Sequence, residues 1–474
     1  MIFLLTVVLL LLASLVLLTL QWKPEPRIAP IPSLSLLQTL KLMFQDISYN
    51  DAHAMTRQVT EEHKVMRVVS FGNWAVVVTS KDAVPAILSD SATFPKAMLT
   101  DAIPGTLFAR YMGNSLAFSH GADWKRQRSI VSPPFRKMFS IQLFHQLAEQ
   151  FVAQMKPGVP FDPHVYTQKI TIDALGKALL GLEFGTLGGN NSEFVEAYRG
   201  VTDVYLQYTY LAIPCLDSPN NPFRAQAFRD MRFVEDFLAD TIRHRHQDLR
   251  DDSTDILSLM LKAKTSLSDQ ELMYNMKMFI VAGHDTTSFA LSAAMFLLAQ
   301  HQEIQRQLHH EIMRTCGTRP PTHDDLKQMH LLDAVIKETL RMYPPSAILA
   351  LRIATKDTTI CGYDIPKGTG VIPDVFAMQN DPEYWPEPNK FIPSRFLDAH
   401  GKPLEKLPGP WLPFSGGERT CLGLGFSLLE QRVVLAKTIA TYNIHLQPPA
   451  ANISLLNSII LRSKPFHVKF LEWQ

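Results

Sequence analysis

The chain has 474 residues, of which 46% are apolar and 19% are charged. This balance excludes a disordered chain and fits a folded protein with a large core, in one large domain or two ordinary ones. Because 46 basic residues nearly equal 45 acidic residues, the overall charge gives no reason to expect a nucleic-acid partner.

The chain begins with an apolar run, since residues 1–20 contain no charged side chain. As a helix, such a run spans roughly 30 Å, the thickness of a bilayer core. We expect residues 1–21 to be a transmembrane anchor rather than a cleaved secretory signal, because no basic start or clear cleavage site is present. Trp22 fits the membrane interface. Lys23 and Arg27 follow the span, so the positive-inside rule places the rest of the chain in the cytosol.

The segment after this run is rich in proline, with Pro24, Pro26, Pro30 and Pro32 at close spacing. Proline cannot continue a helix, so residues 22–34 are expected to form a stiff extended linker. Residues 35–474 contain no repeat, low-complexity tract or long charge run. We therefore expect them to form one domain.

Strand signals come first in this domain, at residues 65–79, where β-branched and apolar residues cluster. A long helix is expected over residues 268–300, because Ser268 and Glu271 match a capping box. Two further helices are expected over residues 301–315 and 331–342, and a second strand region over residues 358–371. The fold class is therefore predicted to be mainly α with small β-sheets.

Cys421 stands in the segment Phe-Ser-Gly-Gly-Glu-Arg-Thr-Cys-Leu-Gly, and an amphipathic helical run follows it. None of the four cysteines has CxxC spacing, which argues against a disulfide framework or a structural zinc site. An isolated cysteine is ordinarily a small buried hydrophobe. Here, nearby glycines allow close backbone approach, and a helix start favours a thiolate, so Cys421 is a candidate metal ligand.

This segment resembles the haem-binding signature of the cytochrome P450 family, Phe-x-x-Gly-x-Arg-x-Cys-x-Gly, through Phe414, Gly417, Arg419, Cys421 and Gly423. The resemblance extends from the apolar run to about residue 470. It implies the family's mainly α fold and a haem b cofactor (iron protoporphyrin IX). It also implies that Cys421 is the axial iron ligand, that Phe414 and Gly423 belong to the cofactor site and that Arg419 meets a propionate.

The stretch of residues 282–287 resembles the family's oxygen-activating motif. There, Gly283 is expected to leave space for oxygen, Thr286 to hydrogen-bond the distal oxygen and Asp285 to feed protons inward. The ordinary alternative is that Thr286 bonds the carbonyl four residues back. His284 occupies the variable position and is expected to be a packing or pocket residue.

Glu338 and Arg341 resemble the family's Glu-x-x-Arg helix, which pairs with a later arginine, here Arg395. Without the resemblance, a solvated surface pair would be the ordinary explanation. In the usual Pro-Glu-Arg-Phe segment the glutamate is replaced by Ser394, which leaves the local support of Arg395 uncertain. These three residues are assigned to structure and haem insertion.

Trp124 and Arg128 resemble the family's Trp-x-x-x-Arg helix, in which both side chains reach a haem propionate, and Arg352 falls where many members have another propionate contact. Lys125, Arg126 and Arg128 are also expected to form a basic docking face for an acidic electron donor. A solvated helix face is the alternative.

The function implied by the resemblance is that of a haem-thiolate monooxygenase. It would activate O2 with two electrons from NADPH, through a flavin reductase partner, to hydroxylate or epoxidise a lipophilic small molecule. The expected location is the endoplasmic reticulum membrane, as a monomer with a cytosolic catalytic domain. The main alternative is a reductase-independent haem-thiolate isomerase or dehydratase. A haem electron carrier and an anchored fold without cofactor are further alternatives. Pocket residues are expected in 111–118, 205–211, 279–287, 346–351 and 454–460.

Overall fold

The computed structural model describes residues 25–44, 47–70, 73–136, 139–190, 192–207, 210–211, 213–263, 267–450, 452–456 and 460–473. The predicted anchor, residues 1–21, lies outside this range. Among the described residues, no helix is both long enough and apolar enough to cross a bilayer.

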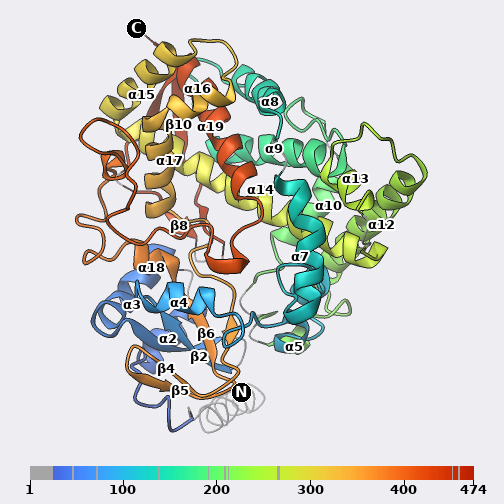
Figure 1. The fold of residues 1–474 in the computed structure, drawn as a ribbon, viewed down its shortest axis with the longest axis vertical. Coiled ribbons are helices and arrows are strands. Elements are labelled where there is room, and N and C mark those ends of the chain that lie inside the picture. Colours follow the sequence, from blue (N-terminus) through green and yellow to red (C-terminus); the bar gives the residue numbers. More distant parts are fainter. Residues whose placement is uncertain are drawn as a thin grey trace, which may run out of the picture.

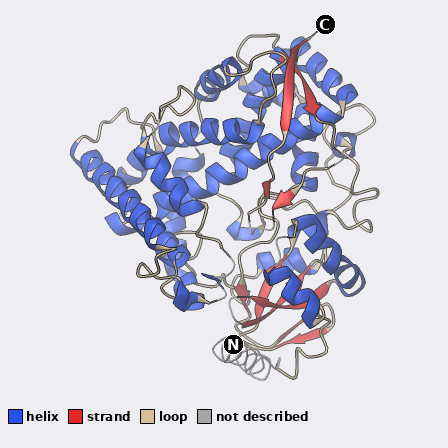
Figure 2. Cartoon of the chain, turned by 180° about the vertical axis from the view of Figure 1, so that it is seen from behind, coloured by secondary structure: helices blue, strands red, loops and turns tan. Residues whose placement is uncertain are grey.

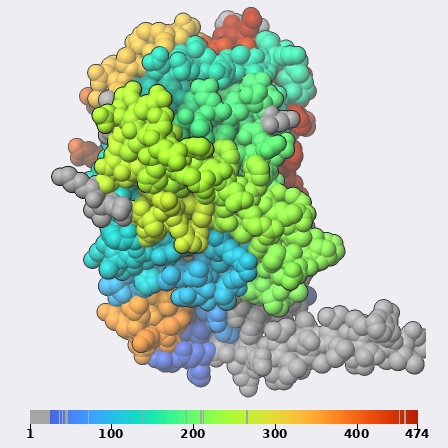
Figure 3. All heavy atoms as spheres, turned by 90° about the vertical axis from the view of Figure 1, so that its right-hand side faces the viewer, coloured from blue at the N-terminus to red at the C-terminus, as the bar shows by residue number. Residues whose placement is uncertain are grey.

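Helices dominate the fold, in agreement with the sequence prediction (Figure 1). The α-helices are α2 (Leu36–Phe44), α3 (Tyr49–His63), α4 (Ala83–Ser89), α5 (Leu99–Ala102), α6 (Leu107–Met112), α7 (Gly121–Arg136), α8 (Ile141–Ala153), α9 (Pro163–Leu175), α10 (Glu193–Thr202), α12 (Ala225–Gln247), α13 (Ile256–Leu261), α14 (Asp269–Gln300), α15 (Gln302–Thr315), α16 (His323–Gln328), α17 (His330–Met342), α18 (Val375–Gln379) and α19 (Leu424–Thr441). Shorter turns are η1 (Gly176–Leu180), η2 (Pro214–Leu216), η3 (Pro393–Phe396) and η4 (Gly417–Arg419). In the space-filling view, α12 and its neighbours form one face of this helical part (Figure 3).

The strands form small sheets at two ends of the molecule and near its middle (Figure 2). The largest sheet has the order β1-β2-β6-β3, in which β2 and β6 are parallel and the other pairs antiparallel. The strands are β1 (Val65–Ser70), β2 (Asn73–Val78), β3 (Arg352–Ile353), β4 (Thr358–Ile360), β5 (Tyr363–Ile365), β6 (Gly370–Pro373), β7 (Tyr442–Gln447), β8 (Leu455–Leu456), β9 (Arg462–Ser463) and β10 (His467–Glu472). Both predicted strand regions are confirmed. Each pairs locally, and β2 also joins β6 across almost 300 residues of sequence.

Helix α14 runs through the middle of the helical part and positions the site (Figure 1). It begins as predicted, because Ser268 accepts from the N–H of Glu271 and the Glu271 carboxylate accepts from the N–H of Ser268. Most of its side chains are buried on every side, by α9, α12, α17 and α19 among others. A helix that is apolar all round must lie in the core of a large domain.

The loop that carries Cys421 is held between α4 and α19. Gly417 has φ +66°, and a Cβ there would lie 2.5 Å from the carbonyl oxygen of Leu88 in α4. Only glycine permits this approach. The chain then passes Cys421 and enters α19 at Leu424, with Gly423 as its N-cap residue.

The proline-rich segment differs from its prediction as a linker over 22–34. In its described part, Ile28 and Ile31 are buried in the core beneath the β1-β2 sheet, and Arg67 donates to the carbonyls of Ile28 and Ala29. The segment is therefore packed onto the domain, and the domain boundary predicted at residue 35 is too late. Proline stops the helix there, but it does not prevent the isoleucines between the prolines from being buried.

Candidate active site

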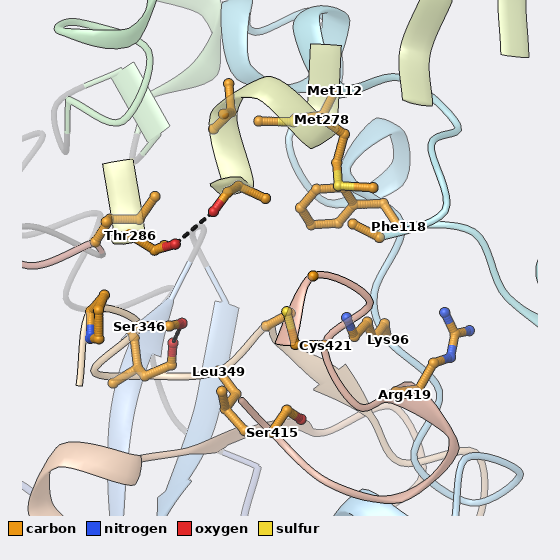
Figure 4. A pocket seen from close by; sticks show the side chains of 18 of the residues that line it. Lys96, Met112, Phe118, Met278, Thr286, Ser346, Leu349, Ser415, Arg419 and Cys421 are labelled. Atoms are coloured by element: carbon orange, nitrogen blue, oxygen red, sulfur yellow. Dashed lines mark hydrogen bonds between the residues drawn. The ribbon is translucent and has the colours of Figure 1, made fainter. Parts of the chain in front are cut away.

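A cavity of about 720 Å³ lies between α14 and the Cys421 loop, with Thr286 on one side and Cys421 on the other (Figure 4). All five ranges predicted for the pocket contribute to its lining, although Tyr111 itself is buried elsewhere. The lining is mainly apolar and includes Phe108, Met112, Phe118, Leu206, Met278, Phe279 and Ile348.

The Cys421 thiol lies deep in the protein, and its accessible surface faces the cavity. Its backbone N–H donates to the carbonyl of Phe414 at 2.9 Å, which closes the loop. Burial raises the pKa of the thiol, whereas the N–H groups of Gly423 and Leu424 and the charge of Lys96 act to lower it. Backbone N–H groups after Cys421 and the charges of Lys96 and Arg128 are therefore directed at the sulfur, as a thiolate metal ligand requires.

Four cations gather beside Cys421: Lys96, Arg128, Arg352 and Arg419. Burial and the neighbouring Arg419 and Arg352 lower the pKa of Lys96 to about 7, and burial together with Arg352 lowers the pKa of Arg419 to about 10. None of the four forms an ion pair within the described part of the chain, although the Glu418 carboxylate acts on Arg352 and Arg419 from farther away. A cluster of mutually repelling cations, two of them buried and two half-buried, is a site for a ligand with more than one negative charge.

The arginines of this cluster are anchored to backbone but incompletely satisfied. Arg419 stacks on the Trp124 ring at 4.0 Å and donates to the carbonyl of Ser119, while Arg352 donates to that of Phe94. The Nε atoms of both arginines are buried without a hydrogen-bond partner. Arg128 donates to the carbonyl of Thr420 at 3.2 Å, beside the cavity.

These residues fit a haem. Gly423 lines the cavity, and a Cβ on it would project into open space, where a flat ligand can approach the backbone. The thiol can bind iron, and the cations with their unpaired N–H groups can bind two carboxylates. Lys96 belongs to this set but was missed in the sequence, because it lies in no motif and only the fold brings it to Cys421.

Thr286 lines the cavity opposite Cys421, and its hydroxyl donates to the carbonyl of Ala282 at 2.6 Å (Figure 4). Thr286 therefore lines the cavity as predicted, and it also makes the hydrogen bond to the carbonyl four residues back that was the alternative explanation for it. Gly283 lines the cavity, as its prediction requires, and a Cβ there would also lie 2.8 Å from Cδ2 of Leu175 in α9. Glycine therefore also permits the close approach of α9 and α14.

Asp285 lies next to Thr286 in sequence but does not line the cavity. Its Oδ2 pairs with Nη2 of Arg462 at 3.2 Å, and its side chain is almost fully buried. Burial raises its pKa, while Arg462 acts in the opposite direction. His284 is also buried and turned toward α9, and it is not a pocket residue.

Glu338, Arg341 and Arg395 meet as predicted. Glu338 and Arg341, both fully buried, are joined by two hydrogen bonds of 2.7 and 3.0 Å, and Nε of Arg395 lies 3.3 Å from Glu338. Arg341 also donates to the carbonyls of Gln379 and Pro388. The cluster therefore joins α17 to the segment before the Cys421 loop.

Two of the three cations of the predicted docking face on α7 are engaged within the protein. Arg126 pairs with Asp123 and with Glu271 of α14, and Arg128 points inward to Thr420. Lys125 alone of the three is exposed. Helical spacing places the three cations close together, but Arg126 pairs with acids on its own helix and on α14, and Arg128 points into the cavity.

A cysteine loop and a long buried helix on opposite sides of one cavity, with unpaired cations beside the thiol, define the haem-thiolate class of proteins. The chain belongs to the cytochrome P450 family, since the family model "Cytochrome P450" matches residues 31–470. It is 31% identical to cytochrome P450 3A29 of Sus scrofa over 358 residues, 70% of each chain. It is 29% identical to cytochrome P450 4c21 of Blattella germanica over 451 residues, which cover 88% of this chain and 87% of that relative.

Solved structures share the fold. The haem domain of cytochrome P450DA superposes with a TM-score of 0.80 at 21% identity, covering 94% of this chain and 98% of that one. The chain is thus an oxidoreductase of the monooxygenase class, and its cofactor is haem b. The recognition made from the Cys421 segment is confirmed.

Proposed function

We propose that the protein is a membrane-anchored monooxygenase that takes two electrons from NADPH, through a flavin reductase, and inserts oxygen from O2 into an uncharged lipophilic molecule. The observation that carries the proposal is the position of the Cys421 thiol, which faces Thr286 across an apolar cavity and has four cations beside it.

Cys421 would hold the haem iron through its thiolate. Lys96, Arg128, Arg352 and Arg419 would hold the propionates, with Trp124 supporting Arg419 from beneath. When bound, the haem supplies the electron-transfer and oxygen-activating chemistry. The protein orients it, and the N–H groups of Gly423 and Leu424 stabilise negative charge on the sulfur.

Thr286 would position a proton over the cavity. Its hydroxyl can release the bond to the Ala282 carbonyl and donate toward the thiol side instead, since it already lines the open space. Asp285 would supply the proton from behind α14, and its contact with Arg462 would stabilise the carboxylate that remains. Glu338, Arg341 and Arg395 would act only through structure, by keeping the region before the Cys421 loop in place.

The substrate would be apolar and uncharged. The cavity wall around Thr286 consists mainly of aromatic, aliphatic and methionine side chains, and the lining cations lie on the Cys421 side, where the propionates would occupy them (Figure 4). A charged substrate would lose its hydration without gaining a partner.

The proposed membrane location and the proposed reductase partner are supported by the amino-acid sequence. The apolar run of residues 1–20, followed by Lys23 and Arg27, supports a single span in the endoplasmic reticulum with the domain in the cytosol. The exposed Lys125 is then one contact for an acidic electron donor.

The test is reconstitution of the haem-loaded chain with a flavin reductase in phospholipid vesicles. Terpenoid, steroid, fatty-acid and aromatic ligands are screened for a spin-state shift, and those that bind are tested for oxygenated product with NADPH. We expect product only with NADPH and reductase. Turnover without them would favour the isomerase or dehydratase alternative. Retention of the thiolate-type reduced CO spectrum by Cys421→Ser would refute the assigned ligand.

A further inference from the structure

His284 lies on the side of α14 away from the cavity, between Asp285 and helix α9. Its side chain is 3% exposed, its Nδ1 lies 2.8 Å from Oγ1 of Thr171, and its ring meets Tyr198 edge to face. The tautomer of His284 determines whether its Nε2 donates to Asp285 or accepts from it, so this buried ring can influence the acid that is proposed to supply protons.

Thr171 influences this tautomer. Its Oγ1 lies 2.9 Å from the carbonyl of Thr167 and 3.2 Å from that of Gln168, so two carbonyl acceptors compete with Nδ1 of His284 for its single proton. When a carbonyl takes the hydroxyl proton, Nδ1–H of the neutral ring donates to Oγ1 and Nε2 has a free lone pair. Nε2 faces Oδ1 of Asp285 at 3.8 Å, too far for a hydrogen bond, as expected when an unprotonated nitrogen faces an ionised carboxylate.

The two oxygens of Asp285 thus have opposite neighbours. Oδ2 meets the Arg462 guanidinium, which stabilises the ionised acid, while Oδ1 meets a nitrogen that can only accept, which stabilises the protonated acid. The other charged or titratable groups around the pair are His164 on α9, Arg199, Tyr198, Tyr205 and Asp203, the last of which also pairs with Arg462 at 3.1 Å.

We propose that His284 is a positioning residue for Asp285: its Nε2 accepts a hydrogen bond from protonated Oδ1, and Arg462 pairs with Oδ2 once the proton has left toward Thr286. A proton from solvent then restores the first state. This inference rests on the proposed role of Asp285. It adds that Asp285 has two states, a protonated one stabilised by His284 of α14 and an ionised one stabilised by Arg462 of β9.

The charge states agree with this arrangement. Burial, with Arg199, His164 and Arg462 nearby, lowers the pKa of His284 to about 3, so the ring stays neutral while Asp285 titrates. Burial raises the pKa of Asp285. Loss of the Nε2 acceptor should lower that pKa, because it removes a partner of the protonated form, and loss of Arg462 should raise it.

The test is an infrared titration of the haem-loaded protein that follows the carbonyl stretch of the protonated carboxyl, identified by its absence in Asp285→Asn. In His284→Asn the side-chain amide can still donate to Thr171 but offers no acceptor at the Nε2 position. In His284→Gln an oxygen stands near that position. If His284 only fills space, His284→Asn should keep the titration midpoint of Asp285. If His284 acts as an acceptor, only His284→Gln should keep it.

We expect the midpoint for Asp285 to fall by about one pH unit in His284→Phe and His284→Asn, the value of one lost hydrogen bond. It should stay near the original in His284→Gln and rise in Arg462→Met. If His284→Phe does not retain haem, the Asn and Gln variants decide. An unchanged midpoint in His284→Asn, or a His284→Gln midpoint as low as that of His284→Asn, would overturn the inference. Unchanged turnover in Asp285→Asn would instead refute the proposed function of Asp285.

Discussion

A buried ion pair between Asp217 and Arg224 holds the segment of residues 213–224 against α6, which lines the cavity. Both side chains are at most 1% exposed, and Nε of Arg224 donates to Oδ1 at 2.7 Å. Oδ2 accepts from the N–H of Leu107 at 2.8 Å, which is the start of α6. Since α6 supplies Phe108 and Met112 to the cavity lining, the pair ties the 213–224 segment to the roof of the site.

Asp217→Leu should therefore be severely destabilising. It leaves the guanidinium of Arg224 buried, with neutral partners only: the Val204 carbonyl, the Gln207 side chain and the Tyr210 ring at 4.2 Å. Removal of one partner of a buried ion pair costs about 3–5 kcal/mol, because the other charge remains desolvated. The exposed pair of Arg27 and Asp357 is the matched control, and Asp357→Leu should change stability far less, although it also removes the acceptor of the Lys367 N–H.

The assay is urea unfolding of the haem-loaded protein, followed by far-ultraviolet circular dichroism and by the haem absorbance. The double variant Asp217→Leu with Arg224→Met removes both charges and should recover most of the loss. A loss for Asp217→Leu no larger than that of Asp357→Leu would contradict the assigned burial. A double variant as unstable as the single one would show that packing, not charge, causes the effect.

Three further substitutions test the site. Lys96→Met removes one charge-assisted contact to a haem propionate, worth about 1.5–3 kcal/mol, so haem transfer to apomyoglobin should be roughly 10- to 150-fold faster. Lys125→Met, which removes an exposed lysine, is the control and should not change the transfer rate. Gly283→Ala should lower stability by about 1–3 kcal/mol in urea unfolding through its overlap with Leu175, and Leu175→Ala in the same chain should relieve it. Glu338→Gln should lower stability by about 3–5 kcal/mol and reduce the yield of haem-loaded protein; a normal yield and unfolding midpoint would show that its partners are not desolvated.

Several features were predictable because neighbouring residues determine them. The Cys421 loop is a contiguous motif, and its glycines and the following helix place backbone N–H groups around the sulfur whatever the rest of the chain does. The start of α14 needs only Ser268 and Glu271, which cap it reciprocally. Arg395 was predicted as the partner of Glu338 through the family resemblance, and the ion pair is present.

Other features depend on segments that are distant in sequence. Lys96 carries no local signal, and its role arises only because its backbone bridges to Arg352 and its charge lies beside Cys421. The inward or outward direction of Arg126 depends on Glu271, and the direction of Asp285 depends on Arg462. A helical repeat gives the face on which a side chain lies, but not which partner another element brings to that face.

The sequence by itself therefore determined the chemistry of the thiol, the mainly α fold class and the long helix opposite the thiol, because each rests on a short contiguous pattern. The tertiary structure alone decided which cations remain unpaired beside the thiol and that Ile28 and Ile31 belong to the core. It also decided that Asp285 lies between Arg462 and His284. These contacts bring together residues that are far apart along the chain, and local propensity carries no information about such contacts.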